Sequence, residues 1–265
     1  MTTAIIGAGV MGETLLSGLL RAGVPKSELL IADRRIERSA EVTKEHGVAN
    51  GTNQEVAAKA DTVVLVVKPQ DMAIVLDEIK DSLRPGTLVV SLAAGITTGF
   101  MEDLLPAKTP VIRVMPNTPA LVDQGMAAIS SGTNSTEEHL VTVETLLRSV
   151  GQVVRVPEKY QDAVTAISGS GPAYIFYVVE AMIEGGVMLG LPRDVANELV
   201  LQTVYGAATM LRETKEHPTV LREQVTSPGG TTVAALRQFD DFKVRAAFLS
   251  AMEAARDRSK ELGMQ

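Results

Sequence analysis

The feature that most constrains the fold is a glycine-rich turn near the start of the chain. Residues 7–12 read GAGVMG and fit the pattern G-x-G-x-x-G, between a short apolar segment and an amphipathic one. In this setting the first glycine permits a tight turn, the second lets the backbone approach a pyrophosphate, and the third lets a helix pack closely on a strand. The helix N-terminus adds free N–H groups that attract phosphate. We predict a strand–turn–helix unit that binds a dinucleotide through Gly7, Gly9, Val10, Met11 and Gly12; the alternative is a purely structural turn.

The first half of the chain repeats this alternation of strand and helix patterns. Amphipathic stretches of helical length separate six short apolar segments, at residues 2–6, 29–33, 62–67, 87–92, 111–115 and 151–156. Continuous β-branched runs that alternate with helices are typical of a parallel sheet covered on both faces. Residues 1–157 are therefore predicted to form a Rossmann-type, doubly wound α/β domain.

The second half has a different character. No further β-branched run bounded by turns follows residue 157, and helical patterns cover 172–190, 193–215, about 231–238 and 242–262. The segment 172–190 is apolar on nearly all sides apart from two glutamates, so it must be covered all round. A small helical domain has few elements of its own to do this. We therefore predict an all-α C-terminal dimerisation domain at residues 158–265, with this segment buried against a second subunit.

Composition excludes several classes of function. Acidic residues outnumber basic ones by 32 to 25, which argues against a nucleic-acid partner. The chain has no cysteine, so disulfides, thiolate zinc sites and cysteine nucleophiles are ruled out, and we expect no metal site. Glu180, Glu184 and the pair Gly185-Gly186 argue against a membrane span in the most apolar segment, and the N-terminus does not resemble a secretory signal. We expect a cytoplasmic protein.

Charged residues after the second apolar segment bear on the choice of cofactor. Asp33 lies 21 residues after Gly12. An acid near this spacing usually binds the ribose 2′-hydroxyl of NAD, whereas an adjacent arginine suits the 2′-phosphate of NADP. Arg34 and Arg35 follow Asp33 directly, so the two signals conflict, and both arginines could equally be the solvated start of a helix. We expect NADPH to be preferred and NADH also to be used.

Two further loops are expected at the carboxyl edge of the sheet, where ligands of such folds bind. One contains Lys68, Pro69 and Gln70, and the other is the MPNTP segment at residues 115–119. Prolines rigidify both loops, and the side chains of Lys68 and Asn117 could hydrogen-bond a ribose or a carboxamide. The methionine of the second loop could instead be ordinary packing.

The chain offers no evident base for alcohol oxidation, a role that His, Lys or Tyr usually fills. His46, His139 and His217 each lie in polar surroundings and are expected to face solvent. Reduction of an imine needs less, because a protonated C=N carbon is already electrophilic and the protein has only to bind and orient the reactants. Residues 225–232, VTSPGGTT, carry no acid or base, yet glycines just before a helix form an anion-binding nest that suits a carboxylate.

In this order, the motifs GAGVMG, KPQ, MPNTP, SGSGPAY (168–174) and VTSPGGTT resemble those of the pyrroline-5-carboxylate reductases over essentially the whole chain. The resemblance implies NAD(P)H-dependent reduction of 1-pyrroline-5-carboxylate to proline, the last step of proline synthesis. It also implies a homodimer with interlocked C-terminal helices, often in rings of dimers. Lys68, Pro69, Ala93 and Asn117 would approach the cofactor. The substrate pocket would be lined by Ser227, Gly229, Gly230, Thr231 and Thr232, with Ser168 and Ser170 nearby. Asp33 is a departure, because many relatives carry an uncharged residue there.

Thr232 is the residue that we expect to contact the substrate nitrogen and so to act in catalysis. The signature places it two residues after the second glycine, where its hydroxyl can face the pocket while the preceding N–H groups hold the carboxylate. Alternatively, Thr232 is only an early helical residue that bonds its own backbone. Three other functions stay open: a 3-hydroxyacid-type dehydrogenase, another imine reductase of this architecture, and a dinucleotide-sensing regulatory dimer. The missing base counts against the dehydrogenase, and a test for turnover would separate a reductase from a sensor.

Overall fold

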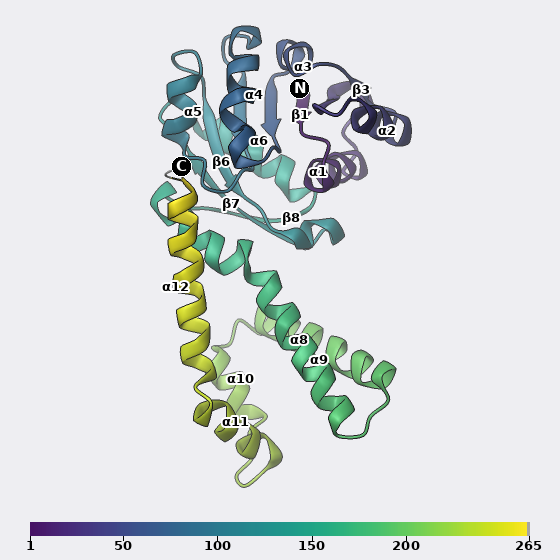
Figure 1. Ribbon diagram of the computed structural model, residues 1–265, viewed down its shortest axis with the longest axis vertical. Helices are drawn as coiled ribbons and strands as arrows, with labels where there is room; N and C mark the ends of the chain where they lie inside the picture. Colours follow the sequence, from purple (N-terminus) through teal and green to yellow (C-terminus); the bar gives the residue numbers. More distant parts are fainter. Residues whose placement is uncertain (264–265) are drawn as a thin grey trace. The chain divides into compact units, whose positions relative to one another are not determined.

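The computed structural model describes residues 1–263 and divides into two compact units. The first unit comprises Met1–Ser170 and the end of the chain from Ala255, and the second is Gly171–Ala254 (Figure 1). In the described part of the first unit, eight strands form one sheet in the order β3-β2-β1-β4-β5-β6-β7-β8. The strands are β1 (Thr3–Ile6), β2 (Leu29–Ala32), β3 (Ala49–Asn50), β4 (Thr62–Leu65), β5 (Leu88–Ser91), β6 (Val111–Met115), β7 (Gly125–Ser131) and β8 (Gly151–Arg155).

Helices cover both faces of this sheet, because alternate residues of each buried strand point to opposite sides. One core joins Ile5 and Ile31 to α1 (Val10–Arg21), α2 (Ile36–His46) and α6 (Glu137–Arg148). The other core joins Ala4 and Val63 to α3 (Asn53–Lys59), α4 (Met72–Ile79) and α5 (Thr98–Leu104). The predicted doubly wound α/β architecture is confirmed.

Two strands were not predicted from the sequence. β7 (GMAAISS) contains a single β-branched residue, and β3 is only two residues long. β7 runs antiparallel to β6, and β8 pairs in parallel with β7, so the expectation of an all-parallel sheet is corrected at this edge. β7 is held by ladders on both sides, and such pairing overrides weak intrinsic strand propensity.

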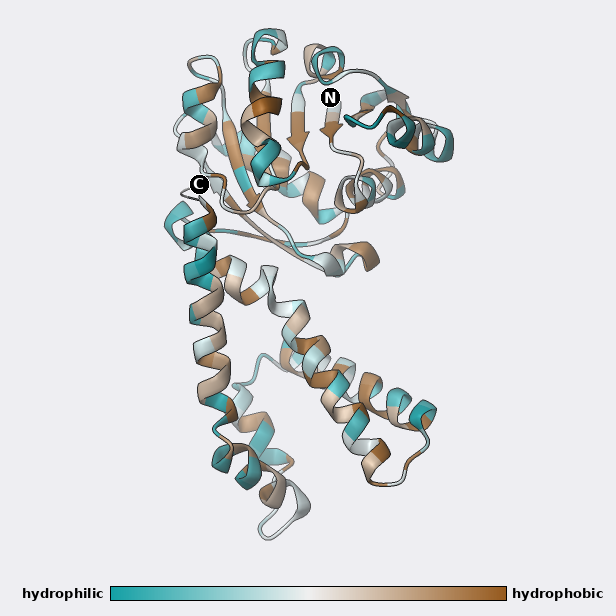
Figure 2. Cartoon of the chain, viewed as in Figure 1, coloured by the Kyte–Doolittle hydropathy of each residue, from teal (hydrophilic) through white to brown (hydrophobic). Residues whose placement is uncertain are grey.

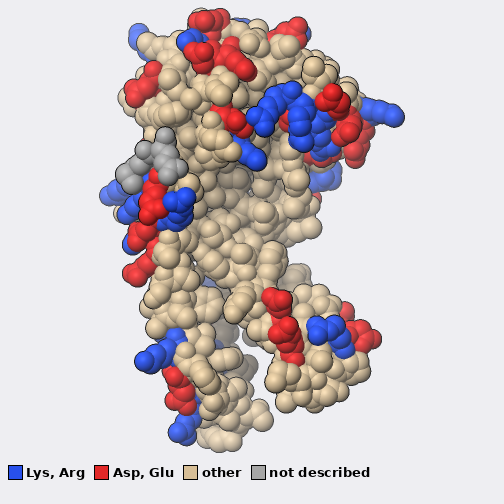
Figure 3. Space-filling model, viewed as in Figure 1, with Lys and Arg blue, Asp and Glu red and all other residues tan. Residues whose placement is uncertain are grey.

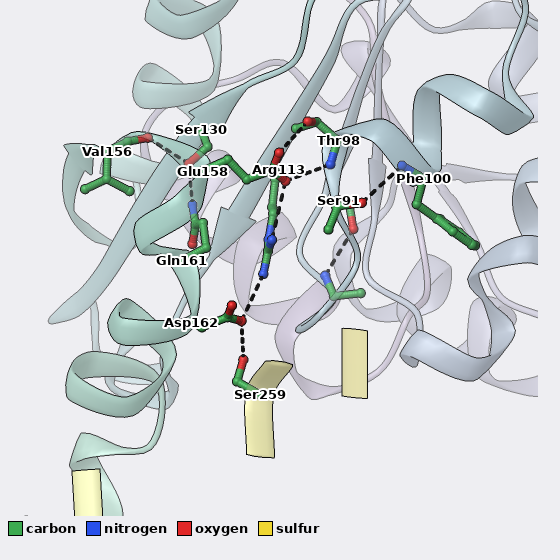
Figure 4. Close-up of polar contacts among 12 residues, drawn as sticks. Ser91, Thr98, Phe100, Arg113, Ser130, Val156, Glu158, Gln161, Asp162 and Ser259 are labelled. Atoms are coloured by element: carbon green, nitrogen blue, oxygen red, sulfur yellow. Dashed lines mark hydrogen bonds and ion pairs between the residues drawn. The ribbon is translucent and has the colours of Figure 1, made fainter. Parts of the chain in front are cut away.

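A buried arginine fastens two later parts of the chain to the sheet (Figure 4). Arg113, on β6, is only 4% exposed, and its guanidinium lies 3.4 Å from a carboxylate oxygen of Glu158 and 3.9 Å from one of Asp162. Asp162 also accepts a hydrogen bond of 2.8 Å from the hydroxyl of Ser259, in the last turns of α12 (Val244–Gly263). Breaking a buried charge pair by removing one partner is strongly destabilising, so this network anchors both segments.

The network explains where the compact units divide. The sequence predicted a boundary between residues 157 and 158, where the strand patterns end. By their contacts the compact units divide after Ser170, and the end of α12 belongs to the first unit, because residues 158–170 pack on the sheet. Gln161, for example, is fully buried and donates a hydrogen bond of 2.8 Å to the hydroxyl of Ser130 on β7.

The second unit is helical. Its elements are α8 (Gly171–Met188), α9 (Arg193–Thr214), α10 (Pro218–Gln224), α11 (Thr231–Asp241) and the first part of α12. α8 and α9 pack together at Gly186, where an added Cβ would lie 3.0 Å from the Cβ of Ala196, a buried residue. The short helix α10 was not predicted; the four longer helices were.

The surface of α8 is unusually apolar for an exposed helix. Within residues 1–263 no residue of α8 is buried, and Phe176 and Tyr177 are 64% and 74% exposed. Figure 2 shows apolar residues spread along α8 and α9. Contiguous apolar surface of this kind marks an interaction site, because water is a poor solvent for it. A single chain therefore leaves its second unit incompletely covered.

Candidate active site

The turn Gly7–Gly9 joins β1 to α1 where the strand order changes direction between β1 and β4, the usual ligand position in such sheets. Gly7 has a φ of +110°, and a Cβ there would lie 2.3 Å from the carbonyl oxygen of Val66. A Cβ on Gly12 would lie 1.9 Å from the carbonyl oxygen of Gly7, whereas a Cβ on Gly9 would meet nothing within 4 Å. The backbone at Gly9 thus borders open space. This geometry fits the three roles expected of the pattern, and the dinucleotide contact itself stays a prediction.

A hollow of about 310 Å³ opens beside this turn. Its walls come from the ends of β1, β2 and β4 and from the residues that follow them. Two polar residues that the sequence reasoning missed, Asn53 and Asp71, also line it. Six residues predicted to bind the cofactor lie in its wall: Gly7, Gly9, Asp33, Arg34, Arg35 and Lys68.

The carboxylate of Asp33 is bonded to the protein through both of its oxygens. Oδ2 accepts a hydrogen bond of 2.8 Å from the backbone N–H of Ala8, the middle residue of the glycine turn. Oδ1 accepts one of 2.9 Å from the backbone N–H of Arg35 and lies 3.4 Å from the Nε of the same residue. The Asp33 side chain is only 10% exposed. It therefore braces the turn as well as lining the hollow.

Arg38 holds the same peptide from the other side. Its Nε donates a hydrogen bond of 2.8 Å to the carbonyl oxygen of Ala8, and its guanidinium also pairs with Glu13 and Glu41. Desolvation lowers the pKa of Arg38, but hydrogen bonds to Glu41 and Glu13 outweigh it and leave the pKa above its ordinary value. A permanently charged arginine and the Asp33 carboxylate thus fix both polar groups of Ala8. No sequence motif signalled the role of Arg38.

The two arginines after β2 differ in their contacts. Arg34 has a side chain that is 76% exposed, and its Nη1 lies 3.4 Å from a carboxylate oxygen of Asp71. Arg35 is also exposed and turns its Nε toward Asp33. Arg34 is therefore an exposed cation in the wall of the hollow, whereas Arg35 partly neutralises an acid there.

None of the remaining predicted cofactor residues lines the hollow. Val10 is exposed in the first turn of α1, and Pro69 begins the 3₁₀ turn Pro69–Asp71. Ala93 is buried after β5, and its N–H donates to the hydroxyl of Ser91 at 3.2 Å. Met11 lines a separate apolar recess together with Asn117.

The amide of Asn117 is engaged with the protein at both ends. Its Nδ2 donates a hydrogen bond of 3.1 Å to the carbonyl of Ser168, and its Oδ1 accepts one of 2.8 Å from the N–H of Met126. Met115 packs where a Cβ on Gly169 would lie, 2.5 Å from its Cε, so the packing interpretation of this methionine fits. The MPNTP loop is thereby joined to the SGSG segment, whose first two residues are the last two of the π-helix Thr165–Gly169. A contact of Asn117 with a cofactor would use its second N–H or the second lone pair of Oδ1.

Ser168 and Ser170 lie at the end of the first unit. The hydroxyl of Ser168 donates to the carbonyl of Val164 at 3.2 Å, and the N–H of Ser170 donates to the carbonyl of Thr165 at 2.8 Å. Short π-helical stretches are frequent at functional sites. The substrate-side prediction for these two serines stays a prediction.

The VTSPGGTT loop lies in the second unit and leads into α11. Gly229 has a φ of +68°, which glycine adopts readily. Gly230 is the N-cap of α11 and offers no side chain to the first turn, so the N–H groups of Thr231 and Thr232 are not capped by it. The N–H of Gly230 donates to the carbonyl of Ser227 at 3.0 Å, which closes the turn. A helix start of this kind can bind an anion.

Within the described residues the hydroxyl of Thr232 makes no hydrogen bond to its own backbone, unlike four other threonine hydroxyls of this unit. Those of Thr203, Thr209, Thr214 and Thr226 each donate to the backbone carbonyl four residues earlier, at 2.5 to 2.8 Å. Within residues 1–263, no such bond of the Thr232 hydroxyl is found. The alternative in which Thr232 bonds its own backbone therefore has no support in the geometry.

One cluster of acidic residues and a histidine could offer ligand atoms to a metal ion. Glu13, Glu45 and His46 bring three such atoms within 4.8 Å of one another. Glu13 already pairs with Arg38, and a cation would have to compete with that guanidinium. The cluster does explain why His46 is partly buried rather than solvent-facing as expected: its Nε2 lies 3.3 Å from Glu13.

Two protein-family models match this chain, one in its N-terminal part and one in its C-terminal part. Residues 2–95 match the family model "NADP oxidoreductase coenzyme F420-dependent", and residues 158–262 match "Pyrroline-5-carboxylate reductase dimerisation". The pyrroline-5-carboxylate reductase of Corynebacterium melassecola is 47% identical over 99% of this chain and 98% of its own.

Two solved structures are similar over the same extent. A pyrroline-5-carboxylate reductase from Coxiella burnetii superposes with a TM-score of 0.93 at 37% identity and covers 98% of each chain. The Plasmodium falciparum pyrroline carboxylate reductase with NADP bound has a TM-score of 0.88 at 30% identity and covers 99% of this chain and 98% of that one. Relatives of this identity over nearly the whole length establish the family, so the chain belongs to the pyrroline-5-carboxylate reductases.

Proposed function

We propose that this protein catalyses the NAD(P)H-dependent reduction of 1-pyrroline-5-carboxylate to proline, the last step of proline biosynthesis. The observation that carries the proposal is the match to reductases of this name along the whole chain, through both the nucleotide-binding part and the dimerisation part. The glycine turn, with open space at Gly9 and a hollow lined by Arg34, Arg35 and Lys68, fits a dinucleotide.

When bound, the reduced nicotinamide supplies a hydride to the protonated cyclic imine. The residues of the glycine turn and of the α1 N-terminus hold the pyrophosphate, since free N–H groups at a helix start attract phosphate. The arginines at the rim give a modest preference for NADPH, with NADH still used. Lys68, Pro69, Ala93 and Asn117 lie toward the rest of the cofactor.

The substrate end of the site uses backbone groups and hydroxyls. The N–H groups of Thr231 and Thr232 hold the carboxylate at the uncapped start of α11, and the turn through Ser227, Gly229 and Gly230 shapes the loop. The hydroxyl of Thr232 bonds the ring nitrogen. Ser168 and Ser170 contribute from the SGSG segment.

Dimerisation covers the apolar helices. The α8 side chains that are exposed in one chain pack against a second copy, with the C-terminal helices of the two subunits interlocked and such dimers able to form rings. This arrangement accounts for a helix with no buried residue in the described chain and agrees with the dimerisation family that its segment matches.

The same surface bears on the membrane. The helical stretch Glu158–Met188 is long and apolar enough to cross a bilayer by length and composition alone. It also carries Glu180 and Glu184, which are costly in lipid. We infer that a second subunit covers it rather than lipid, and that the protein acts in the cytoplasm. Acidic and basic side chains are interspersed over the first unit in Figure 3, which does not suit a nucleic-acid partner.

The decisive experiment mixes the purified protein with NADPH and pyrroline-5-carboxylate and follows the absorbance of the reduced nicotinamide together with the formation of proline. Oxidation of NADPH in step with proline supports the proposal. Binding of NADPH without turnover would favour a dinucleotide-sensing dimer, and turnover only with an acyclic imine would favour another imine reductase.

A further inference from the structure

Two carboxylates, Asp33 and Asp71, line the hollow that also holds Arg34. Sequence spacing singles out Asp33 as the acid that opposes a 2′-phosphate, and Asp71 belongs to no motif of that kind. The contacts of the two side chains reverse this assignment. We propose that Asp71 is the residue that limits the preference for NADPH, and that Asp33 is a positioning residue that braces the glycine turn for either cofactor. The inference rests on the proposed function, since it concerns how the same hollow chooses between two nucleotides.

The bonds of Asp33 leave it little capacity to read a ribose. One oxygen accepts from the N–H of Ala8 at 2.8 Å, and the other accepts from the N–H of Arg35 at 2.9 Å with the Arg35 Nε nearby. A carboxylate has about four acceptor positions, and these contacts occupy most of them. The adjacent guanidinium also offsets its charge. Because the carboxylate is turned to the glycine turn, its loss should affect the pyrophosphate end that NADH and NADPH share.

Asp71 is placed to compete for Arg34. Its carboxylate oxygen lies 3.4 Å from Nη1 of Arg34, at the start of α4 in the wall of the same hollow. Arg34 is otherwise exposed and is the cation that a 2′-phosphate would pair with. A phosphate that engages Arg34 must share it with Asp71 and comes close to a like charge. NADH carries no 2′-phosphate, so Asp71 penalises NADPH alone.

The test measures the Kd values of NADPH and NADH for the full-length protein without substrate, by calorimetry or by the change in fluorescence of the reduced nicotinamide on binding. Asp71→Asn should tighten NADPH about three- to tenfold, with NADH nearly unchanged, as expected for removing one partly exposed like charge near a phosphate. The gain should shrink as salt is added. Asp33→Asn should weaken both nucleotides by a similar factor and leave their ratio unchanged.

Asp81→Asn is the matched control, because it removes the same charge in the 3₁₀ turn Lys80–Ser82, which follows the far end of α4. It should change neither Kd. An unchanged NADPH to NADH ratio in Asp71→Asn, or a selective gain for NADPH in Asp33→Asn, overturns the inference while leaving the proposed function intact. If the wild-type protein binds neither nucleotide, the proposed function fails and the inference fails with it. Should Asp33→Asn not fold, the Asp71 and Asp81 variants still decide the matter.

Discussion

Replacing Thr232 by alanine tests the proposed substrate contact of the VTSPGGTT loop most directly. Thr232 is the second residue of α11, is half-buried, and has no hydrogen bond from its hydroxyl to residues 1–263. Under the proposed function this hydroxyl bonds the ring nitrogen as the imine becomes an amine. A neutral hydrogen bond contributes about 1 kcal/mol net, and one to a charged group about 2–3 kcal/mol. We expect kcat/KM to fall about 10- to 100-fold.

The fold should tolerate the change. Alanine has the higher helix propensity, and substitutions at partly exposed positions usually alter stability by less than about 0.5 kcal/mol. The Tm and the Kd of NADPH should therefore stay close to those of the wild type. The assay is steady-state kinetics with pyrroline-5-carboxylate varied at saturating NADPH. Thr232→Ser, which keeps the hydroxyl, should recover most of the loss.

Thr226→Ala is the matched control on the other side of the turn. Its hydroxyl already donates to the carbonyl of Arg222 at 2.5 Å, so its removal should cost much less than that of Thr232. If Thr232→Ala keeps full kcat/KM while Thr226→Ala loses it, the assignment is wrong and another hydroxyl of the loop makes the contact.

Three further outcomes are expected. Arg34→Ala should raise the KM for NADPH about tenfold or more and the KM for NADH far less, because only NADPH has a 2′-phosphate to bond the arginine. Steady-state kinetics with each cofactor tests this, and equal increases in the two KM values would contradict it. Ala181 lies on the exposed surface of α8. Ala181→Arg should give insoluble protein or an inactive monomer, because a charge would enter an interface of more than about 2,000 Å². Light scattering gives the oligomeric state, and a monomer with full activity would exclude the interlocked dimer. A hydrogen bond from the N–H of Thr2 and, to a lesser extent, the guanidinium of Arg84 hold the pKa of Asp61 below its ordinary value of 3.8. The ionised Asp61 therefore stabilises the fold above that value, and this stabilisation is lost as the pH falls through the folded pKa. Asp61→Asn should lower the Tm at neutral pH but not in strong acid, and a decrease in Tm that is the same at every pH would refute the linkage.

The sequence predicted the nucleotide-binding sheet well because its signals there are local. β-branched runs mark the buried strands, and each glycine of GAGVMG answers to a steric need that the structure makes explicit at Gly7 and Gly12. β7 was not predicted because its small residues have low intrinsic strand propensity and are held in the sheet by pairing with the neighbouring strands. Likewise, the boundary after residue 157 followed the end of the strand pattern, whereas Arg113 ties residues beyond it to the sheet.

Side-chain orientation is a second limit on what can be predicted from the sequence. Spacing identified Asp33 and Asn117 as candidates, but it could not say that both side chains would hydrogen-bond the protein itself, Asp33 through both oxygens and Asn117 through both ends of its amide. Asp71 was missed because nothing in the sequence shows which side chain it contacts. It follows KPQ at the carboxyl end of a strand, so its position was available, but only its approach to Arg34 gives the position a meaning.

A loop without acids or bases is a suitable partner for this reaction rather than a deficient one. A lysine beside the substrate nitrogen would repel a protonated imine, and a carboxylate would stabilise that cation and so make its carbon a poorer hydride acceptor. The hydroxyl of Thr232 is neutral and both donates and accepts, so it can accept from the N–H of the imine and donate to the lone pair of the amine. The backbone N–H groups at the start of α11 are likewise fixed before the substrate arrives, and fixed dipoles need no reorganisation during the reaction. The chemistry that the loop lacks is thus chemistry that would hinder the step.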